Sequence, residues 1–127
     1  MDQKERQTLL KAQQGELDAV LMYNALAKAV KEKSDAETFR RLAAEEGRHA
    51  AVFKNLTEQT LQPKKTLAIL LPILYKLMGR KRLYPIIARF EYGAADTYAP
   101  VAERFPEVQS VKDDEKRHGE TVKGLLQ

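Results

Sequence analysis

We predict an all-α fold, a four-helix bundle of two antiparallel helical hairpins joined by a long crossover that contains a short extra helix. The chain of 127 residues has the size of one domain, which we take to span 1–127. Apolar residues make up 43% of it, and helix breakers are few, with 6 Gly and 5 Pro. Four stretches repeat apolar residues every three or four positions, which is the period of a helix with one buried face.

The first hairpin is predicted from the first two of these stretches. Residues 2–32 form one helix, whose inward stripe is Leu9, Ala12, Glu16, Val20, Tyr23, Ala27 and Val30. The second helix is expected over 35–57, with Ser34 or Asp35 as the residue that caps its start. Its inward stripe is Phe39, Leu42, Glu46, His49, Phe53 and Leu56.

The helical pattern breaks at 62–65, and an apolar stretch from Leu67 to Met78 follows. We expect a short connecting helix over 65–79, distorted at Pro72 because proline cannot donate a backbone hydrogen bond. This helix is too short to cross a membrane, which takes about 20 residues. Basic residues flank it, so the segment 64–82 either packs on the bundle, which we favour, or lies on an anionic membrane surface or a dimer face.

The second hairpin is predicted from the last two stretches. One helix is expected over 83–104, kinked or ended early by Pro100, with Tyr84, Ile87, Glu91, Ala94, Tyr98, Val101 and Phe105 inward. A turn at Phe105-Pro106 leads to a helix over 107–126, with Val108, Val111, Glu115, His118, Val122 and Leu125 inward. Two hairpins joined by one long crossover describe a ferritin-like bundle.

Six ionisable side chains interrupt the four otherwise apolar stripes. The first and third bundle helices carry a lone Glu, and the second and fourth carry a Glu-x-x-His pair. These residues are Glu16, Glu46, His49, Glu91, Glu115 and His118. A buried carboxylate without a partner is costly, so four of them at one depth require positive charge, which two divalent metals supply. A polar core without metal is the alternative, which we weigh less.

The spacing of the six residues supports a two-metal site. Counted from the turns, each lone Glu lies level with the Glu-x-x-His pair of its own hairpin, at about 1.5 Å per residue. Both histidines of the chain follow a Glu by three positions and an Arg by one. On one helix face, such a Glu can bridge two metals while the His binds one. We assign Glu46 and Glu115 to bridging positions, and the other four residues to terminal positions.

The ligand types favour iron. The chain contains no cysteine, which excludes thiolate-bound zinc, iron–sulfur clusters and disulfides. Carboxylate and imidazole ligands suit iron, with manganese as an alternative, better than structural zinc. Four Glu carboxylates also balance the charge of two Fe(II) ions in a core of low dielectric constant.

Four neighbouring residues are candidates for a supporting role. Tyr23 and Tyr98 lie seven positions after Glu16 and Glu91. They either hydrogen-bond a terminal carboxylate or serve only as core aromatics, and we weigh the two interpretations evenly. Glu45 and Asp114 precede the bridging Glu residues. We favour solvated surface acids for both over a role in orienting the histidines.

These residues resemble the ferritin-like di-iron carboxylate superfamily and, within it, rubrerythrin-like proteins without a rubredoxin domain. The resemblance covers nearly the whole chain and implies the same six ligands, with Glu46 and Glu115 bridging. Peroxidases of the family have an additional Glu three positions after the third-helix ligand, where this chain has Ala94, and a Cys-rich domain that supplies electrons. The connector with its basic flanks looks more like the ferritin-like domains of vacuolar-type iron transporters, or like demethoxyubiquinone hydroxylases.

We therefore expect a di-iron oxidoreductase, a peroxidase or ferroxidase, that oxidises Fe(II) with hydrogen peroxide or O2. The alternatives are an iron-binding or buffering module without turnover, and a quinone-type di-iron hydroxylase. The expected partners are the oxidant, an external electron donor and a second copy in a homodimer. We expect a cytoplasmic location, because the chain begins without a signal-peptide pattern. We expect no nucleic acid, since the basic residues form no recognisable motif.

Overall fold

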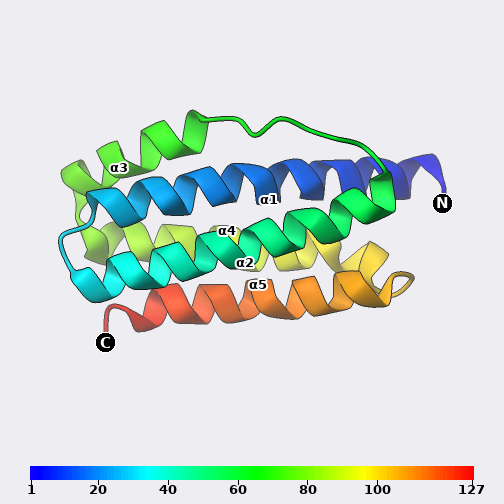
Figure 1. Cartoon of the computed structure of the whole chain (residues 1–127). Coiled ribbons are helices and arrows are strands. Elements are labelled where there is room, and N and C mark those ends of the chain that lie inside the picture. Colours follow the sequence, from blue (N-terminus) through cyan, green and yellow to red (C-terminus); the bar gives the residue numbers. More distant parts are fainter.

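The computed structural model describes residues 1–127 and contains helices but no strand (Figure 1). The helices are α1 (Gln3–Ala29), α2 (Lys33–Thr57), α3 (Thr66–Met78), α4 (Arg80–Ala102) and α5 (Pro106–Gly124). α1 and α2 form one antiparallel hairpin, α4 and α5 form the other, and α3 lies along α1 (Figure 1). The predicted ferritin-like helical bundle is confirmed. None of the helices combines the length and the apolar character needed to cross a membrane.

The start of α2 differs from the prediction. α2 begins at Lys33, so a cap at Ser34 or Asp35 was wrong. The Asp35 side chain is buried instead, and its carboxylate accepts hydrogen bonds from Arg80 Nε at 3.0 Å and from the Tyr84 hydroxyl at 2.7 Å. A carboxylate that pairs with a guanidinium and a phenol inside the fold gains stronger hydrogen bonds than one at an exposed helix end. This contact ties α2 to the start of α4.

Side chains of α1 hold the extended part of the crossover, residues 58–65. Gln13 Nε2 donates to the carbonyl oxygen of Gln59 at 2.8 Å. Three residues further along the crossover, the carbonyl oxygen of Gln62 accepts a hydrogen bond from Gln14 Nε2 at 2.9 Å. The crossover therefore follows α1 closely until α3 begins.

The junction between α3 and α4 is tighter than the sequence suggested. Gly79, with a φ of 80°, is the only residue between the two helices, so α4 begins at Arg80 and not at residue 83. Glycine adopts this positive φ without a steric penalty. α3 continues through Pro72, and α4 runs two residues beyond Pro100 before it ends at Ala102.

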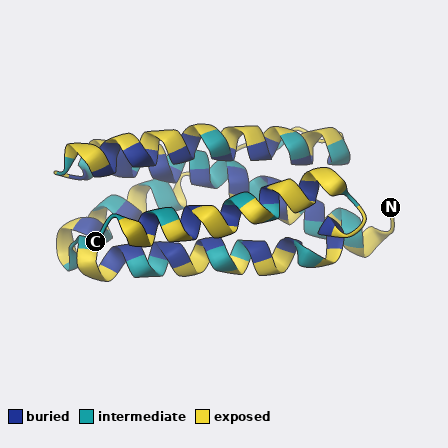
Figure 2. Cartoon of the chain, turned by 90° about the horizontal axis from the view of Figure 1, so that it is seen from below, coloured by how far each residue is buried: buried dark blue, intermediate teal, exposed yellow.

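The apolar core is divided into two clusters. The larger has 16 buried residues and includes Tyr23, Phe39 and Ile87. The smaller has 8 and includes Leu9 and Phe53. Buried positions recur along the inward faces of the helices, with exposed positions opposite (Figure 2). The middle of the bundle, between the two clusters, is therefore available to the ionisable side chains on the same stripes.

Candidate metal centre

The four long helices bring six ionisable side chains together in the middle of the bundle. α1 and α4 each contribute one Glu, and α2 and α5 each contribute a Glu and a His three residues later. We call this set the Glu/His cluster; it consists of Glu16, Glu46, His49, Glu91, Glu115 and His118. Every member is at most 5% exposed. The helical stripe explains this, because each residue occupies a core-facing position between apolar ones.

The Glu/His cluster divides into two groups of four that share two carboxylates. One group is Glu16, Glu46, His49 and Glu115, and the other is Glu46, Glu91, Glu115 and His118. Within each group, one ligand atom from every residue lies within 4.8 Å of the others. Each group thus offers three carboxylates and one imidazole to a single point, and the two shared residues are those predicted to bridge.

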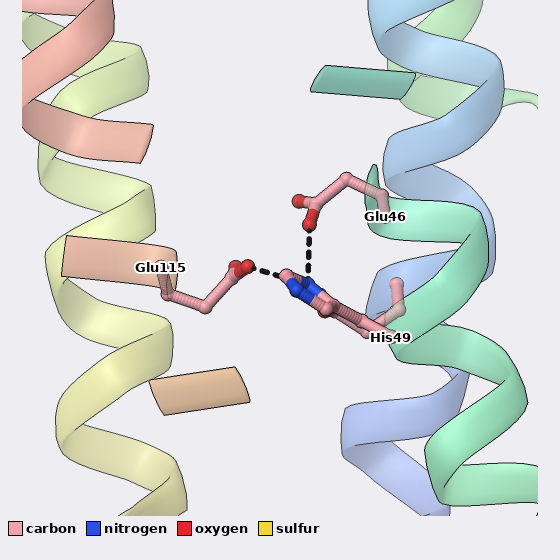
Figure 3. A group of neighbouring side chains, drawn as sticks. Glu46, His49 and Glu115 are labelled. Carbon is pink, nitrogen blue, oxygen red and sulfur yellow. Dashed lines mark hydrogen bonds and ion pairs between the residues drawn. The ribbon is translucent and has the colours of Figure 1, made fainter. Parts of the chain in front are cut away.

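In both histidines, Nδ1 faces the carboxylates. His49 Nδ1 lies 2.9 Å from Glu46 Oε1, 2.9 Å from Glu16 Oε1 and 3.0 Å from Glu115 Oε1 (Figure 3). His118 Nδ1 lies 3.4 Å from an oxygen of Glu46, Glu91 and Glu115. One N–H group donates well to one acceptor, so three oxygens around a single nitrogen exceed what a proton can satisfy.

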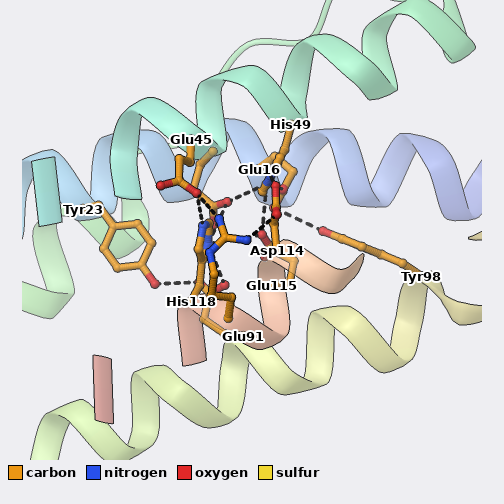
Figure 4. Close-up of polar contacts among 11 residues, drawn as sticks. Glu16, Tyr23, Glu45, His49, Glu91, Tyr98, Asp114, Glu115 and His118 are labelled. Carbon is orange, nitrogen blue, oxygen red and sulfur yellow. Dashed lines mark hydrogen bonds and ion pairs between the residues drawn. The ribbon is translucent and has the colours of Figure 1, made fainter. Parts of the chain in front are cut away.

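The other ring nitrogen of each histidine binds a carboxylate of the opposite hairpin. His49 Nε2 lies 2.8 Å from Asp114 Oδ2, and His118 Nε2 lies 2.9 Å from Glu45 Oε1. Arg117 joins the two acids, with its guanidinium 2.6 Å from Asp114 and 2.7 Å from Glu45. The interpretation of both acids as solvated surface groups was wrong, because α2 and α5 face each other and each acid reaches the histidine across the interface (Figure 4).

Two tyrosine hydroxyls complete the surroundings. Tyr23 donates to Glu91 Oε1 at 2.6 Å, and Tyr98 donates to Glu16 Oε2 at 3.2 Å (Figure 4). Each bond crosses from one hairpin to the other, so each tyrosine contacts the lone Glu of the partner hairpin. The hydroxyls orient these two carboxylates within the bundle.

Burial sets the proton affinities of the carboxylates. It raises the pKa of Glu16 well above 4.5, and the nearby Glu46 carboxylate raises it further. It also raises the pKa of Glu91, to about 8. Burial raises the pKa of Glu115 too, but the nearby imidazoles of His118 and His49 outweigh it and lower this pKa below 4.5. Glu16 and Glu91, which each contact one histidine, therefore bind a proton more strongly than Glu115, which contacts both.

The pKa values of both histidines are also raised, which for an imidazole favours the charged form. Burial lowers the pKa of His49, but the close carboxylates of Glu115, Glu16 and Glu46 outweigh it and raise the value to about 12. The pKa of His118 is raised in the same way. Positive charge is thus strongly favoured at both imidazoles. A bound cation would take the place of these protons, since metal ligation requires deprotonated Nδ1 atoms.

The residues present fit two metal ions. Four buried side-chain polar atoms in the protein make no hydrogen bond, and all belong to the Glu/His cluster: Glu46 Oε2, Glu91 Oε2, Glu115 Oε1 and His118 Nδ1. Buried polar atoms are usually paired, so unpaired oxygen and nitrogen atoms grouped in this way are suited to bind a cation. Oxygen and nitrogen ligands without thiolate are compatible with iron or manganese.

A mainly apolar pocket of about 290 Å³ reaches the carboxylates. Its inner wall includes four Glu residues of the Glu/His cluster together with Tyr98. Its apolar wall consists of Ala19, Met22, Leu67, Ile87, Phe90 and Ala94. Phe90 is 59% exposed, so the pocket extends to the protein surface. Ala94, at the position noted above for an additional Glu, contributes a small apolar side chain.

Sequence reasoning missed Arg117. The two halves of the chain share the pattern acid, Glu, any residue, Arg and His, at 45–49 and 114–118, which could have drawn attention to both arginines. Only one of them contributes, however. Arg117 joins the two outer acids, whereas Arg48 is exposed and forms no ion pair. The two halves are therefore alike in the Glu and His residues of the cluster, but only the second half supplies an arginine that contacts the outer acids.

Comparison with known protein families gives one match. The rubrerythrin family model matches residues 7–126 of the chain. This range includes the whole Glu/His cluster and most of every helix. Neither the curated proteins nor the solved structures give a significant match.

Proposed function

Because this chain belongs to the rubrerythrin family, a ferritin-like di-iron family, we propose that its Glu/His cluster binds two iron ions. We further propose that the loaded protein oxidises Fe(II) with hydrogen peroxide or O2, in peroxide removal or iron handling. Family membership supports a di-iron protein. The reaction itself is our inference from the site.

One observation carries this proposal: two groups of four ligand atoms share Glu46 and Glu115. A carboxylate common to both groups can bind two ions with its two oxygens, which keeps the ions close to each other. Glu16 and His49 would complete one position, and Glu91 and His118 the other. The four carboxylates then balance the four positive charges of two Fe(II) ions in a buried site.

When bound, two Fe(II) ions supply two electrons to one oxidant. With hydrogen peroxide and two protons, the overall products would be two waters and two Fe(III) ions, so the peroxide would be reduced and the iron would be oxidised. An electron donor from outside this chain must then return two electrons, because the chain has no cysteine-based centre of its own. Manganese in the same ligands is the alternative metal.

The protein side chains hold this site in place. Asp114 and Glu45 accept hydrogen bonds from the Nε2 atoms of the two histidines, which keeps both Nδ1 atoms aimed at the cluster. The Tyr23 and Tyr98 hydroxyls hold the two lone Glu carboxylates. The apolar pocket wall limits the water that reaches the oxidant.

The apolar pocket also favours a second candidate, a quinone-type hydroxylase. A pocket of about 290 Å³ with a mainly apolar lining can hold part of a lipophilic substrate beside the carboxylates. Turnover of a quinone analogue with a reductase present would support this candidate. A third candidate is an iron-buffering module, which binds the same ions but shows no steady-state turnover.

The proposal is tested by the metal content of matched variants after anaerobic loading with Fe(II). We expect two irons per chain in the wild type, fewer than one in Glu46→Ala, and one in Glu91→Ala. The reason is that Glu46 belongs to both groups of ligands and Glu91 to one. Glu103→Ala, at an exposed acid that forms no ion pair, is the control and should keep both irons.

Rapid mixing of the loaded protein with hydrogen peroxide or air then measures oxidation, followed by steady-state turnover with a chemical electron donor. Two irons in Glu46→Ala would contradict the ligand assignment. Tight binding of zinc, or no iron in the folded wild type, would contradict the di-iron proposal. The homodimer and the cytoplasmic location remain predictions from the sequence.

A further inference from the structure

Positive charge is concentrated in one quarter of the chain. Residues 59–90 contain seven of the 22 basic residues and none of the 18 acidic ones. This segment therefore carries a charge of +7, while the rest of the chain carries −3, which together give the net +4. The segment comprises residues 59–65 of the crossover, all of α3, Gly79 and the first half of α4. The basic character of the protein thus comes from a single continuous segment.

The exposed face of α3 is apolar. Ile69 is 63% exposed, Leu70 43%, Ile73 49% and Leu77 78%. These residues are spaced by one, three and four positions, so they lie on one side of the helix. The opposite side carries Leu71 and Tyr75, which are buried against the bundle. α3 therefore presents an apolar stripe to the outside that no part of this chain covers.

Unpaired lysines border this stripe. Lys65 and Lys76 are eleven residues apart, which is about three helical turns, so they lie above one another along the same edge of α3. Lys64, Lys81 and Arg82 lie at its two ends. All five are exposed and none forms an ion pair, whereas Arg80 pairs with Asp35. The bases next to the stripe are therefore free to bind an external anionic group.

We propose that α3 and its basic flanks bind the surface of an anionic lipid bilayer. An apolar stripe bordered by lysines is the arrangement with which a helix lies in the interface of a membrane, with its apolar side chains among the acyl chains and its cations at the lipid phosphates. The 13 residues of α3 measure about 20 Å, against about 30 Å for the hydrocarbon core, so α3 lies along the membrane plane. This inference does not depend on the proposed function.

The charge favours a bilayer over a second copy of the chain. A two-fold dimer through α3 would place two segments of charge +7 against each other, since such an interface uses the same patch on both subunits. An anionic bilayer instead complements this charge, because each base near its surface is attracted to the lipid phosphates. Leu67 of α3 also lines the pocket that reaches the carboxylates, so the proposed binding helix forms part of the wall of the site.

Vesicle flotation of the full chain tests the proposal. We expect the protein to float with vesicles of mixed phosphatidylglycerol and phosphatidylcholine at about 0.1 M salt, and not with phosphatidylcholine alone. At about 1 M salt the screening length falls from about 10 Å to about 3 Å, so the bound fraction should fall sharply. The assay is run on both metal-free and iron-loaded protein, and equal binding would show that it is separate from iron chemistry.

Two variants separate the basic and the apolar contributions. The triple variant Lys64→Gln, Lys65→Gln and Lys76→Gln should bind about a hundred-fold more weakly. The matched control removes three exposed, unpaired lysines from other helices, Lys4→Gln, Lys11→Gln and Lys116→Gln, and should bind within about three-fold of the wild type. Leu77→Gln, at the most exposed apolar position, should weaken binding about ten-fold. Far-ultraviolet circular dichroism verifies that each variant is folded.

Two outcomes would overturn the proposal. The first is that no protein floats with an excess of anionic vesicles at low salt. The second is that the two triple variants lose binding equally, which would mean that total charge and not this surface is responsible. Sedimentation velocity adds a further criterion: a wild-type dimer that Leu77→Gln converts to monomer, without vesicle binding, would assign the stripe to a second copy instead.

Discussion

Replacement of Tyr23 by phenylalanine should destabilise the metal-free protein, and more strongly at pH 9 than at pH 7. The Tyr23 hydroxyl is fully buried and donates a 2.6 Å hydrogen bond to Glu91 Oε1. Glu91 Oε2 has no hydrogen-bond partner. The Tyr23→Phe variant therefore leaves a buried carboxyl group without any hydroxyl donor, and the cost depends on whether that group is charged.

The magnitude follows from the pKa of Glu91, which burial raises to about 8. At pH 7 most of the Glu91 carboxyl is protonated, so the lost bond is worth about 1 kcal/mol, as for a neutral pair. At pH 9 most of it is ionised, and the loss should reach about 2 kcal/mol. In a domain of this size these losses correspond to about 4 °C and about 8 °C in Tm.

Urea unfolding of the metal-free protein, followed by circular dichroism at both pH values, measures this difference. Tyr98→Phe is the matched control, because its hydroxyl is also buried but donates a longer bond, 3.2 Å, to Glu16. We expect a smaller loss for the control at each pH. A loss below about 0.5 kcal/mol for Tyr23→Phe at pH 9, or a loss that does not change with pH, would refute the reasoning.

Three further predictions concern stability. The pKa of His49 is raised from 6.5 to about 12, so the stabilising contribution of its proton is complete below pH 6.5 and is lost as the pH rises toward 12. The metal-free protein should therefore unfold at a lower urea concentration at pH 9 than at pH 6, and iron loading should reduce this difference. Asp35→Asn should lower the free energy of unfolding in urea by about 2 kcal/mol, which is less than the loss of a fully buried pair because the arginine partner is 28% exposed. The control Asp113→Asn, at an exposed position, should lower it by less than about 0.5 kcal/mol. Gly119→Ala would place a Cβ 2.6 Å from the Tyr92 ring, and the Tm should fall by about 4 to 8 °C as that ring is displaced; an unchanged Tm would show that the ring moves freely.

The inner part of the site could be predicted because it depends on one helix at a time. A Glu or His at a core-facing position of an amphipathic helix points inward whatever the neighbouring helix is, so the helical period alone places Glu16 or His118 in the middle of the bundle. Counting residues from each turn then gives the depth within a hairpin. Both steps use local geometry, which the sequence specifies directly.

Contacts between the two hairpins could not be predicted in this way. Whether Glu45 and Asp114 face water or a histidine depends on how α2 lies against α5, and no local pattern determines that packing. The same limit explains the misplaced helix cap. Asp35 has the composition of a cap residue, but the contact with Arg80 depends on the position of α4, which lies 45 residues further along the chain.

The Glu/His cluster also links the two hairpins of the bundle. Each hairpin supplies three of its six residues. The hydrogen bonds of the two tyrosines to the lone Glu residues, and those of the two histidines to Asp114 and Glu45, all run from one hairpin to the other. Each group of four ligands likewise takes residues from both hairpins. Separation of the hairpins would therefore dismantle both groups of ligands in one event, so that release of any bound ions and opening of the bundle would be a single cooperative transition.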